Sequence, residues 1–333
     1  MRLLKPEKLF ADCPSPVCIL EGPDHIYTYT NRAYEELING CSILDRAVKD
    51  VSPELAGQGF IKILDDVFAT GNAYHCKEMS LDINQSDTYK NLHVSLSCYP
   101  LMDDSDLVYG IFIQVIDNTE QVELNKILLT ELHHRVKNNL AFIISLIQLQ
   151  ANEVKDHQQQ LLLTNTQKRI RTIAKVHDLI LNQQDLKRIP VEKLLWSLFD
   201  HGLNYFDTGE SMVKIDVDEL FININQAIPL GLICNEIIGL IKARLSENYS
   251  VSIKSDLTSL PKVELFITIN DVGDNFFEKD ALSEEKSFEA KLTNILAMQL
   301  KAKIDVTKED GSTTLIIRFT KADVTGSGAG YFI

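Results

Sequence analysis

E-L-H-H-R-V-K-N-N-L, residues 131–140, lies at the centre of a long stretch with a helical repeat. Apolar residues recur through this stretch at steps of three or four: Leu124, Leu128, Leu132, Val136, Leu140, Ile143 and Ile147. Steps of that size place side chains on one face of an α-helix. The sequence therefore predicts a long helix with an apolar stripe.

His134 is the candidate reactive residue of this helix. It falls about opposite the stripe, because successive helical residues are rotated by about 100°, so we expect it to face solvent. Glu131 and Asn138 share its face at helical spacing. A histidine accepts a phosphoryl group through a neutral ring nitrogen while a partner holds the other nitrogen, and Glu131 is the best placed partner. On spacing alone, a solvated helix face without chemistry remains an open alternative.

A resemblance favours the chemical interpretation. The run at 131–140, with S-L-I-Q-L-Q at 145–150, resembles the dimerisation and phosphoacceptor domain of sensor histidine kinases of the H-R-x-x-N class. R-I-R-T-I-A-K-V-H-D-L at 169–179 resembles the start of the second helix of that hairpin. The resemblance implies a helical hairpin over residues 119–190 that pairs with a second copy to form a four-helix bundle.

The same resemblance assigns roles at the first helix. His134 is implied as the phosphorylated residue, and Glu131, Arg135 and Asn138 as its companions in the motif. We expect His177 to pack against or orient its neighbours rather than to react. A homodimer follows from the family's bundle.

Composition bounds the class of protein. The 333 residues suffice for two or three domains, and 45% hydrophobic residues argue against global disorder. Lys and Arg total 33 against 47 Asp and Glu, a net charge of −14, which disfavours a nucleic-acid partner. The six cysteines lack zinc-ligand spacing, so we expect no metal site and reduced thiols. No apolar run is long enough for a membrane span, so we expect a soluble cytoplasmic protein.

Residues 1–118 read as a separate sensor domain. Val17 to Leu20 and Ile26 to Thr30 flank a turn signal and predict a hairpin, and the region 92–116 predicts two more strands. The motifs N-R-A-Y-E, P-E-L-A-G-Q-G-F, V-F-A-T-G and V-I-D-N-T-E-Q together resemble a PAS domain with a five-stranded sheet. The element D-N-T-E-Q sits where such domains pass into an output helix. No cofactor or ligand for this domain follows from the sequence.

Residues 191–320 resemble the ATP-binding domain of histidine kinases, an α/β sandwich, so the chain as a whole is expected to be an α+β multidomain protein. P-L-G-L-I-C-N-E-I-I at 229–238 matches a helix that carries Asn235 and Glu236, and F-I-T-I-N-D-V-G-D-N at 266–275 matches the adenine-binding box with Asp271 and Gly273. These four residues are the implied nucleotide contacts.

Three departures argue against efficient use of ATP and Mg²⁺. Leu240 stands where the family has a metal-holding asparagine, and leucine offers no oxygen ligand. Asn275 replaces the second glycine of the box, and Glu289 falls where a glycine turn would hold phosphate. A carboxylate there repels a polyphosphate. We therefore expect a degenerate ATP-binding domain.

Three functions remain open. The favoured one is phosphotransfer through His134 to or from the aspartate of a response-regulator receiver domain. The second is an active kinase that labels His134 with ATP, and the third is a scaffold that binds response regulators or a partner histidine kinase. Residues 321–333, rich in Gly and Ser, are expected to be a flexible tail.

Overall fold

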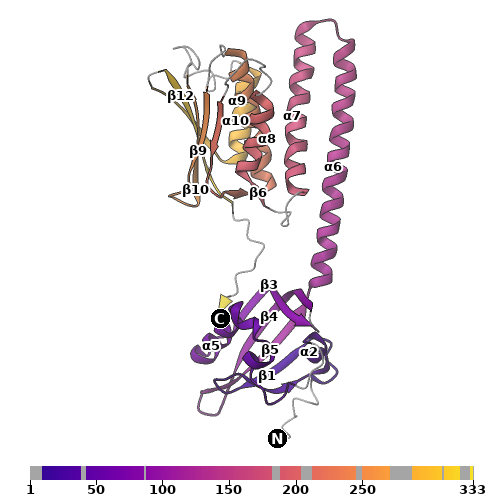
Figure 1. Ribbon diagram of the computed structural model, residues 1–333, viewed down its shortest axis with the longest axis vertical. Coiled ribbons are helices and arrows are strands. Elements are labelled where there is room, and N and C mark those ends of the chain that lie inside the picture. The colour runs from indigo at the N-terminus through magenta and orange to yellow at the C-terminus, as the bar shows by residue number, and fades with distance from the viewer. Residues whose placement is uncertain are drawn as a thin grey trace. The chain divides into compact units, whose positions relative to one another are not determined.

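The structure is a computed structural model that describes residues 10–38, 43–85, 88–181, 188–203, 212–244, 250–270, 287–309, 311–322 and 331–332 (Figure 1). It divides into two compact units. Unit one comprises residues 1–126 and 325–333, and unit two comprises residues 127–324. Both units contain helices and sheets, which confirms the predicted α+β class.

Unit one is built on a six-stranded antiparallel sheet. Its strand order is β13-β3-β4-β5-β1-β2. The bounds are β1 Val17–Glu21, β2 Ile26–Thr30, β3 Tyr74–Gln85, β4 Thr88–Met102, β5 Val108–Asp117 and β13 Tyr331–Phe332. The predicted hairpin is β1 paired with β2, and the two later predicted strands are β4 and β5. Alternate residues of β4 are buried, as the sequence pattern requires: Leu92, Val94, Leu96 and Cys98.

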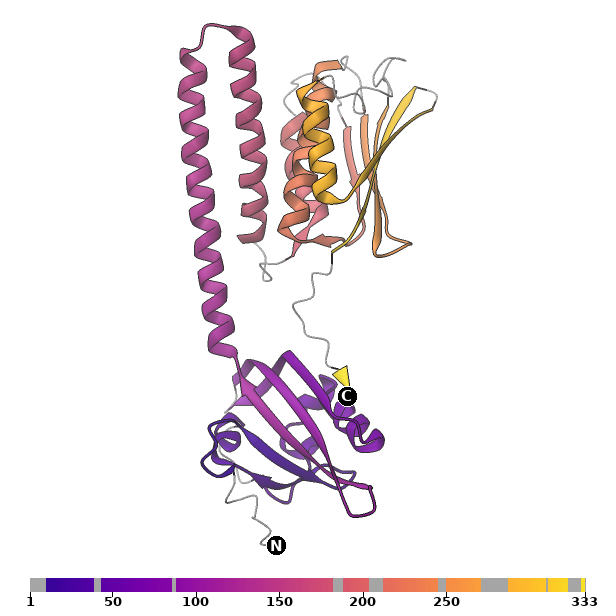
Figure 2. The same ribbon diagram turned by 180° about the vertical axis from the view of Figure 1, so that it is seen from behind.

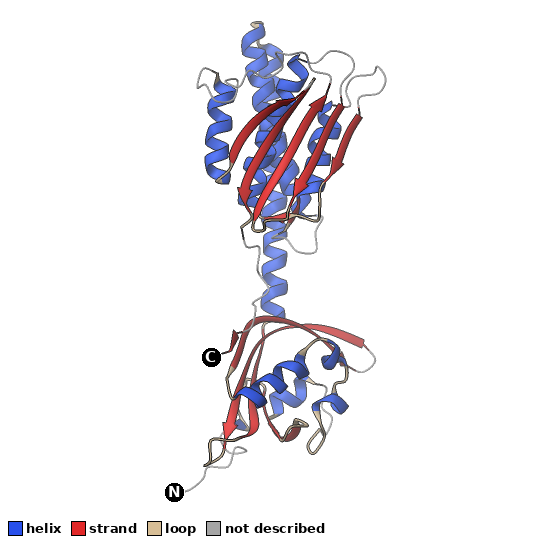
Figure 3. Ribbon diagram, turned by 90° about the vertical axis from the view of Figure 1, so that its left-hand side faces the viewer, coloured by secondary structure: helices blue, strands red, loops and turns tan. Residues whose placement is uncertain are grey.

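Short helices accompany this sheet and close its core (Figure 3). They are α2 Arg32–Leu37, α3 Val48–Val51, α4 Glu54–Gly57 and α5 Phe60–Thr70. Asn31 begins α2, where its side chain accepts a hydrogen bond from the amide of Tyr34. The same side chain accepts from the amide of Val17 and donates to the carbonyl of Cys13, so one residue joins α2, β1 and the preceding segment. The five strands from 1–118 and these helices match the expected PAS architecture.

Two residues within the expected flexible tail form a short strand. Tyr331–Phe332 forms β13, which pairs with His75 and Tyr74 at the edge of β3. A two-residue strand is too short to show an alternating pattern, so the sequence does not reveal it. The tail residues 323–330 lie outside the described residues.

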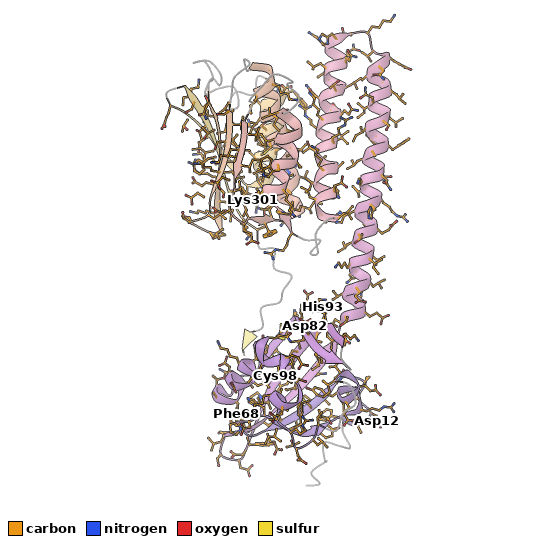
Figure 4. The ribbon with its side chains drawn as sticks, viewed as in Figure 1. Asp12, Phe68, Asp82, His93, Cys98 and Lys301 are labelled. Carbon is orange, nitrogen blue, oxygen red and sulfur yellow. The ribbon has the colours of Figure 1, made fainter. Side chains whose placement is uncertain are left out.

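Hydrogen bonds join the start of α6, Thr119–Glu153, to strand β4 of unit one. The amide of His93 donates to the Thr119 hydroxyl at 2.9 Å, and the amide of Asn118 donates to the carbonyl of His93 at 2.7 Å. Asp117 accepts from the amide of Thr119 and so satisfies a donor of the first helical turn. Figure 4 labels His93 close to the point where α6 leaves the sheet. The D-N-T-E-Q element therefore is a strand-to-helix connection.

Unit two begins within the first helix of a helical hairpin and continues into a sheet covered by helices. The hairpin consists of α6 and α7, His157–Leu181. The five-stranded sheet has the order β11-β12-β10-β9-β7, and the short pair β6-β8 stands apart from it. The remaining bounds are β6 Ile189–Pro190, α8 Val191–Leu203, β7 Met212–Asp216, β8 Phe221–Ile222, α9 Ile224–Arg244, β9 Ser250–Asp256, β10 Lys262–Asn270, α10 Phe288–Leu300, β11 Lys303–Glu309 and β12 Ser312–Thr320.

Helices α8, α9 and α10 lie between the sheet and α7 in both opposite views (Figures 1 and 2). The core of unit two includes α7 as well as these helices, because Val176 and Ile180 belong to the same buried apolar cluster as Leu194 of α8 and Ile233 of α9. The second helix of the hairpin is therefore part of the core of the C-terminal domain.

Helix α9 is unusually apolar. It is the single helix among the described residues that is long and apolar enough to span a membrane, over Ile224–Ala243, and 61% of that window is buried. Leu230, Ile233, Ile237 and Ile241 form part of the buried cluster. This composition is that of a helix at the centre of a domain core.

Helix α6 presents its faces differently from the expected stripe. Within this chain, several stripe residues are exposed: Leu124, Leu128, Leu132, Val136 and Ile143. The face turned to α7 carries the residues Thr130, His133, Lys137, Leu140, Ile144, Ile147 and Ala151. Contacts with α7 support this assignment, since Gln167 donates to the carbonyl of Ile144 and Gln160 to that of Ala151. The exposed apolar residues of α6 thus form a second face that α7 does not cover, while other apolar residues of the helix, such as Leu140 and Ile147, lie on the face turned to α7.

Candidate functional site

His134 lies on the exposed surface of α6, as its position in the helical repeat predicts. Its neighbour His133 is partly buried and points toward α7. The two adjacent rings point in different directions because one residue corresponds to about 100° of helical rotation. Among the described residues, no hydrogen bond to the ring of His134 is present. The ring is therefore open to an approaching phosphoryl donor or acceptor.

Glu131 does not hold His134 in this structure. Its carboxylate accepts a hydrogen bond at 2.7 Å from the Nε of Arg135, four residues along α6. Both spacings, three residues to His134 and four to Arg135, allow side-chain contact on a helix. The charged guanidinium is the stronger partner for a carboxylate. Asn138 is exposed on the same helix, one turn beyond His134.

The inner neighbour of His134 forms an imidazole pair across the hairpin. Nδ1 of His133 and Nδ1 of His177 are 2.8 Å apart, so one ring must donate and the other accept. Burial lowers the pKa of His133, and burial together with the charge of His133 lowers that of His177. Both rings are therefore biased toward the neutral form. His177 is buried and hydrogen-bonded to His133, so it packs within the hairpin.

An ion pair extends this contact by one turn of α6. The Lys137 ammonium lies 2.5 Å from the Asp178 carboxylate. With the imidazole pair, it sets the register of α6 against α7 beside His134. Sequence reasoning identified His177 without its partner and did not identify Lys137 or Asp178. The available signal was the repeat of partly polar residues at 130, 133, 137 and 140 on α6.

The second candidate site lies on α9, where Asn235 and Glu236 were implied as nucleotide contacts. Glu236 is buried and accepts two hydrogen bonds from Arg169 of α7, from Nε and from Nη2, each at 2.8 Å. The Asn235 amide donates to the same carboxylate at 3.3 Å. Both oxygens of Glu236 are therefore engaged with side chains of this chain.

Two of the three departures from the nucleotide-binding motif, Leu240 and Glu289, lie within the described residues. Leu240 packs partly buried against the apolar core of unit two, so its side chain offers no metal ligand. Glu289 lies in the first turn of α10, after the helix-capping residue Ser287. The other implied nucleotide residues, Asp271 and Gly273, and the third departure, Asn275, lie outside the described residues.

Comparison with known proteins finds a family match over most of the hairpin and α8. Residues 131–205 match the family HisKA_2, described as histidine kinase. Blue-light-activated histidine kinase 2 of Erythrobacter litoralis (strain HTCC2594) is 24% identical over 314 residues, which cover 88% of this chain and 86% of that protein. Sensor histidine kinase PdtaS of Mycolicibacterium smegmatis (strain ATCC 700084 / mc(2)155) is 25% identical over 166 residues, 48% of this chain and 31% of that protein.

Two solved structures are also similar. The Erythrobacter litoralis EL346 blue-light activated histidine kinase has a TM-score of 0.42 at 19% identity, with 95% of this chain and 98% of that chain covered. The PAS domain of Bordetella pertussis BvgS has a TM-score of 0.30 at 21% identity, with 37% and 90% covered. The family match confirms the resemblance to sensor histidine kinases of the H-R-x-x-N class.

Proposed function

We propose that this member of the two-component histidine kinase family carries a phosphoryl group on His134 and exchanges it with the aspartate of a receiver domain. The observation that carries the proposal is the contrast between two adjacent histidines. His133 is held by His177 inside the hairpin, whereas His134 is exposed within the segment that matches the family. An exposed imidazole on a rigid helix is accessible to a folded protein partner.

The transfer step needs few groups from this chain. A neutral ring nitrogen of His134 attacks the phosphorus of the receiver's phosphoaspartate, the nitrogen–phosphorus bond forms, and the phosphorus–oxygen bond to aspartate breaks. The aspartate leaves as a carboxylate. The reverse reaction passes the group from His134 to the receiver. The receiver supplies the Mg²⁺ site, and the Arg135–Glu131 pair keeps a cation next to the reacting histidine.

In this proposal the C-terminal domain provides a docking surface for the receiver domain and does not bind ATP efficiently. Leu240 removes a metal ligand, and Glu289 places a negative charge near the expected phosphate turn. The two oxygens of Glu236 are bound by Arg169, which leaves this carboxylate poorly placed to act as a base. These three features support loss of efficient ATP use.

The second candidate is an ATP-dependent kinase that labels His134. Both curated relatives are named histidine kinases, and Asn235 and Glu236 are retained on α9. In either case the PAS-type unit is the sensor and a second copy of the chain is the dimer partner. The cytoplasm is the expected compartment for both functions.

Transfer from a phosphorylated receiver domain tests the proposal. A receiver labelled by a small-molecule phosphodonor is mixed with the parent protein and with His134→Ala. We expect acid-labile label on the parent, no label on His134→Ala, and label on the control His157→Ala, which removes an exposed histidine of the same hairpin. Equal labelling of parent and His134→Ala would refute the assignment of His134.

A parallel incubation with γ-labelled ATP and Mg²⁺ separates the two candidates. Under the phosphotransfer proposal, ATP leaves the parent unlabelled while the receiver labels it. Label from ATP on the parent but not on His134→Ala would establish the kinase instead. Receiver binding without label from either source would leave a scaffold as the function.

A further inference from the structure

Arg169 of α7 is enclosed by groups suited to a guanidinium. Its Nε and Nη2 donate to the two oxygens of Glu236, which is the fork geometry that arginine makes with a carboxylate. Its guanidinium carbon lies over the ring of Phe288, 4.9 Å from the ring centroid, within the range of a cation–π contact. Planar stacking and bidentate pairing are properties of arginine that lysine lacks.

The carboxylate in this contact is well shielded from water. The side chain of Glu236 is 6% exposed and that of Arg169 is 16% exposed. Asn235 adds a hydrogen bond to Glu236 and limits its rotation. A buried charge requires a partner because desolvation is costly. The buried carboxylate of Glu236 therefore requires a cationic partner, and the guanidinium of Arg169 is that partner.

Glu289 adds a second negative charge to the same place. The hydrogen bonds from Arg169 to Glu236, with the charge of Glu236 and a smaller contribution from the charge of Glu289, raise the pKa of Arg169 above its usual value. Glu289 stands in the first turn of α10, directly after Phe288. An anion at this position repels a polyphosphate but attracts a guanidinium. The departure that weakens a nucleotide site thus strengthens a site for arginine.

We propose that the C-terminal domain carries a guanidinium-binding site formed by Glu236, Asn235, Phe288 and Glu289, and that Arg169 of the chain's own hairpin is its ligand. This site docks α9 and α10 on α7. It goes beyond phosphotransfer at His134 and stands independently of whether His134 is phosphorylated.

The packing around the site explains why one arginine matters for docking. Thr172, one turn after Arg169, faces Gly231 of α9, where an added Cβ would lie 3.2 Å from the Thr172 methyl group. The helices are therefore in close contact at this level. Val176 and Ile180, further along α7, are held by the apolar core. The contact of α7 with the C-terminal domain is therefore polar at Arg169 and apolar at Val176 and Ile180.

Chemical rescue tests the site. In the full-length Arg169→Ala protein, we expect hydrogen exchange at the α7 amides around residues 169–176 to rise by about tenfold or more, because Glu236 loses its partner. Added ethylguanidinium should restore slow exchange by filling the vacated position. Ethylammonium at the same ionic strength should not, because an ammonium cannot form the fork or stack as a plane.

Three further proteins make the result decisive. Arg171→Ala, which removes an exposed arginine from the same helix, should behave as the parent. Glu236→Gln should raise exchange in α7 and should not respond to ethylguanidinium. Arg169→Lys should recover only part of the protection. Equal rescue by both cations, no rescue, or a rise in exchange spread evenly over β9, β10 and β12 would overturn the proposal, since the last result indicates general unfolding.

Discussion

At the scale of single residues, the pair His133 and His177 makes the stability of the hairpin depend on pH. Burial lowers the pKa of both rings below the ordinary value of 6.5, so the folded state favours neutral imidazoles. The unfolded chain then binds protons first as the pH falls. The contribution to stability is fully present above pH 6.5 and is lost as the pH drops through lower values. We expect the parent to unfold at lower urea concentration below pH 6.5 than above it.

Substitution of one ring checks this dependence. His177→Phe keeps a planar ring but removes its titration, so the loss of stability on acidification should become smaller than in the parent. The exposed His157→Gln should retain the parent's dependence. An identical change with pH in parent and His177→Phe would show that other groups cause it.

The exposure of His134 was predictable, because helical rotation is fixed once the helix is recognised. Its partner was not predictable, because Glu131 has both His134 and Arg135 at helical spacing and the pattern does not choose between them. The pairing of Arg169 with Glu236 joins residues 67 positions apart. Such a contact depends on tertiary packing, so periodicity in either helix carries no sign of it.

At the scale of elements, the connection from β5 to α6 joins the sheet of unit one to the long helix of the hairpin. The Thr119 hydroxyl accepts a hydrogen bond from the backbone amide of His93, so a side chain of α6 is bonded to the backbone of β4. Thr119→Val keeps the shape but removes the acceptor. We expect a loss of about 1 kcal/mol in the unfolding free energy of unit one, the usual value of one hydrogen bond, and faster exchange of the His93 amide.

The matched control for this change is Thr164→Val on α7, whose hydroxyl donates to the carbonyl of Gln160 on an exposed surface. That carbonyl remains accessible to water, so little effect is expected. If Thr119→Val leaves the exchange of the His93 amide unchanged, the hydroxyl does not join α6 to the sheet.

The strands β4 and β5 of unit one were predictable from alternation, since each of them buries one face. The faces of α6 did not follow as simply. Leu132 and Val136 belong to a clear apolar repeat and yet are exposed, whereas the more polar row at His133 and Lys137 meets α7. A helix with two contact faces carries two overlapping sequence repeats, one for each face. The more apolar repeat dominates the hydrophobic pattern, so the repeat that contacts α7 is not recognised from the sequence.

At the scale of the whole molecule, the hairpin leaves a large apolar surface without a partner in one chain. It is formed on α6 and α7 by the exposed residues Leu128, Leu132, Phe142, Ile143, Leu146, Leu149, Leu161 and Leu162. Contiguous exposed apolar surface on this scale is unusual for a monomer and indicates a protein interface. We propose a second copy of the chain as its partner, because the resemblance of the hairpin to phosphoacceptor domains implies pairing into a four-helix bundle.

Charge substitution on this surface tests the dimer. Phe142 and Leu149 are 65% and 63% exposed, and burial of each against a second copy stabilises the dimer by about 1.5 kcal/mol or more. Phe142→Glu with Leu149→Glu should therefore weaken dimerisation roughly a hundredfold or more, because each 1.4 kcal/mol is about tenfold. Leu107→Glu changes an equally exposed residue of the β4–β5 turn and should leave the dimer intact. Sedimentation velocity distinguishes the results, and a parent that sediments as a monomer at every concentration would show that another protein covers this surface.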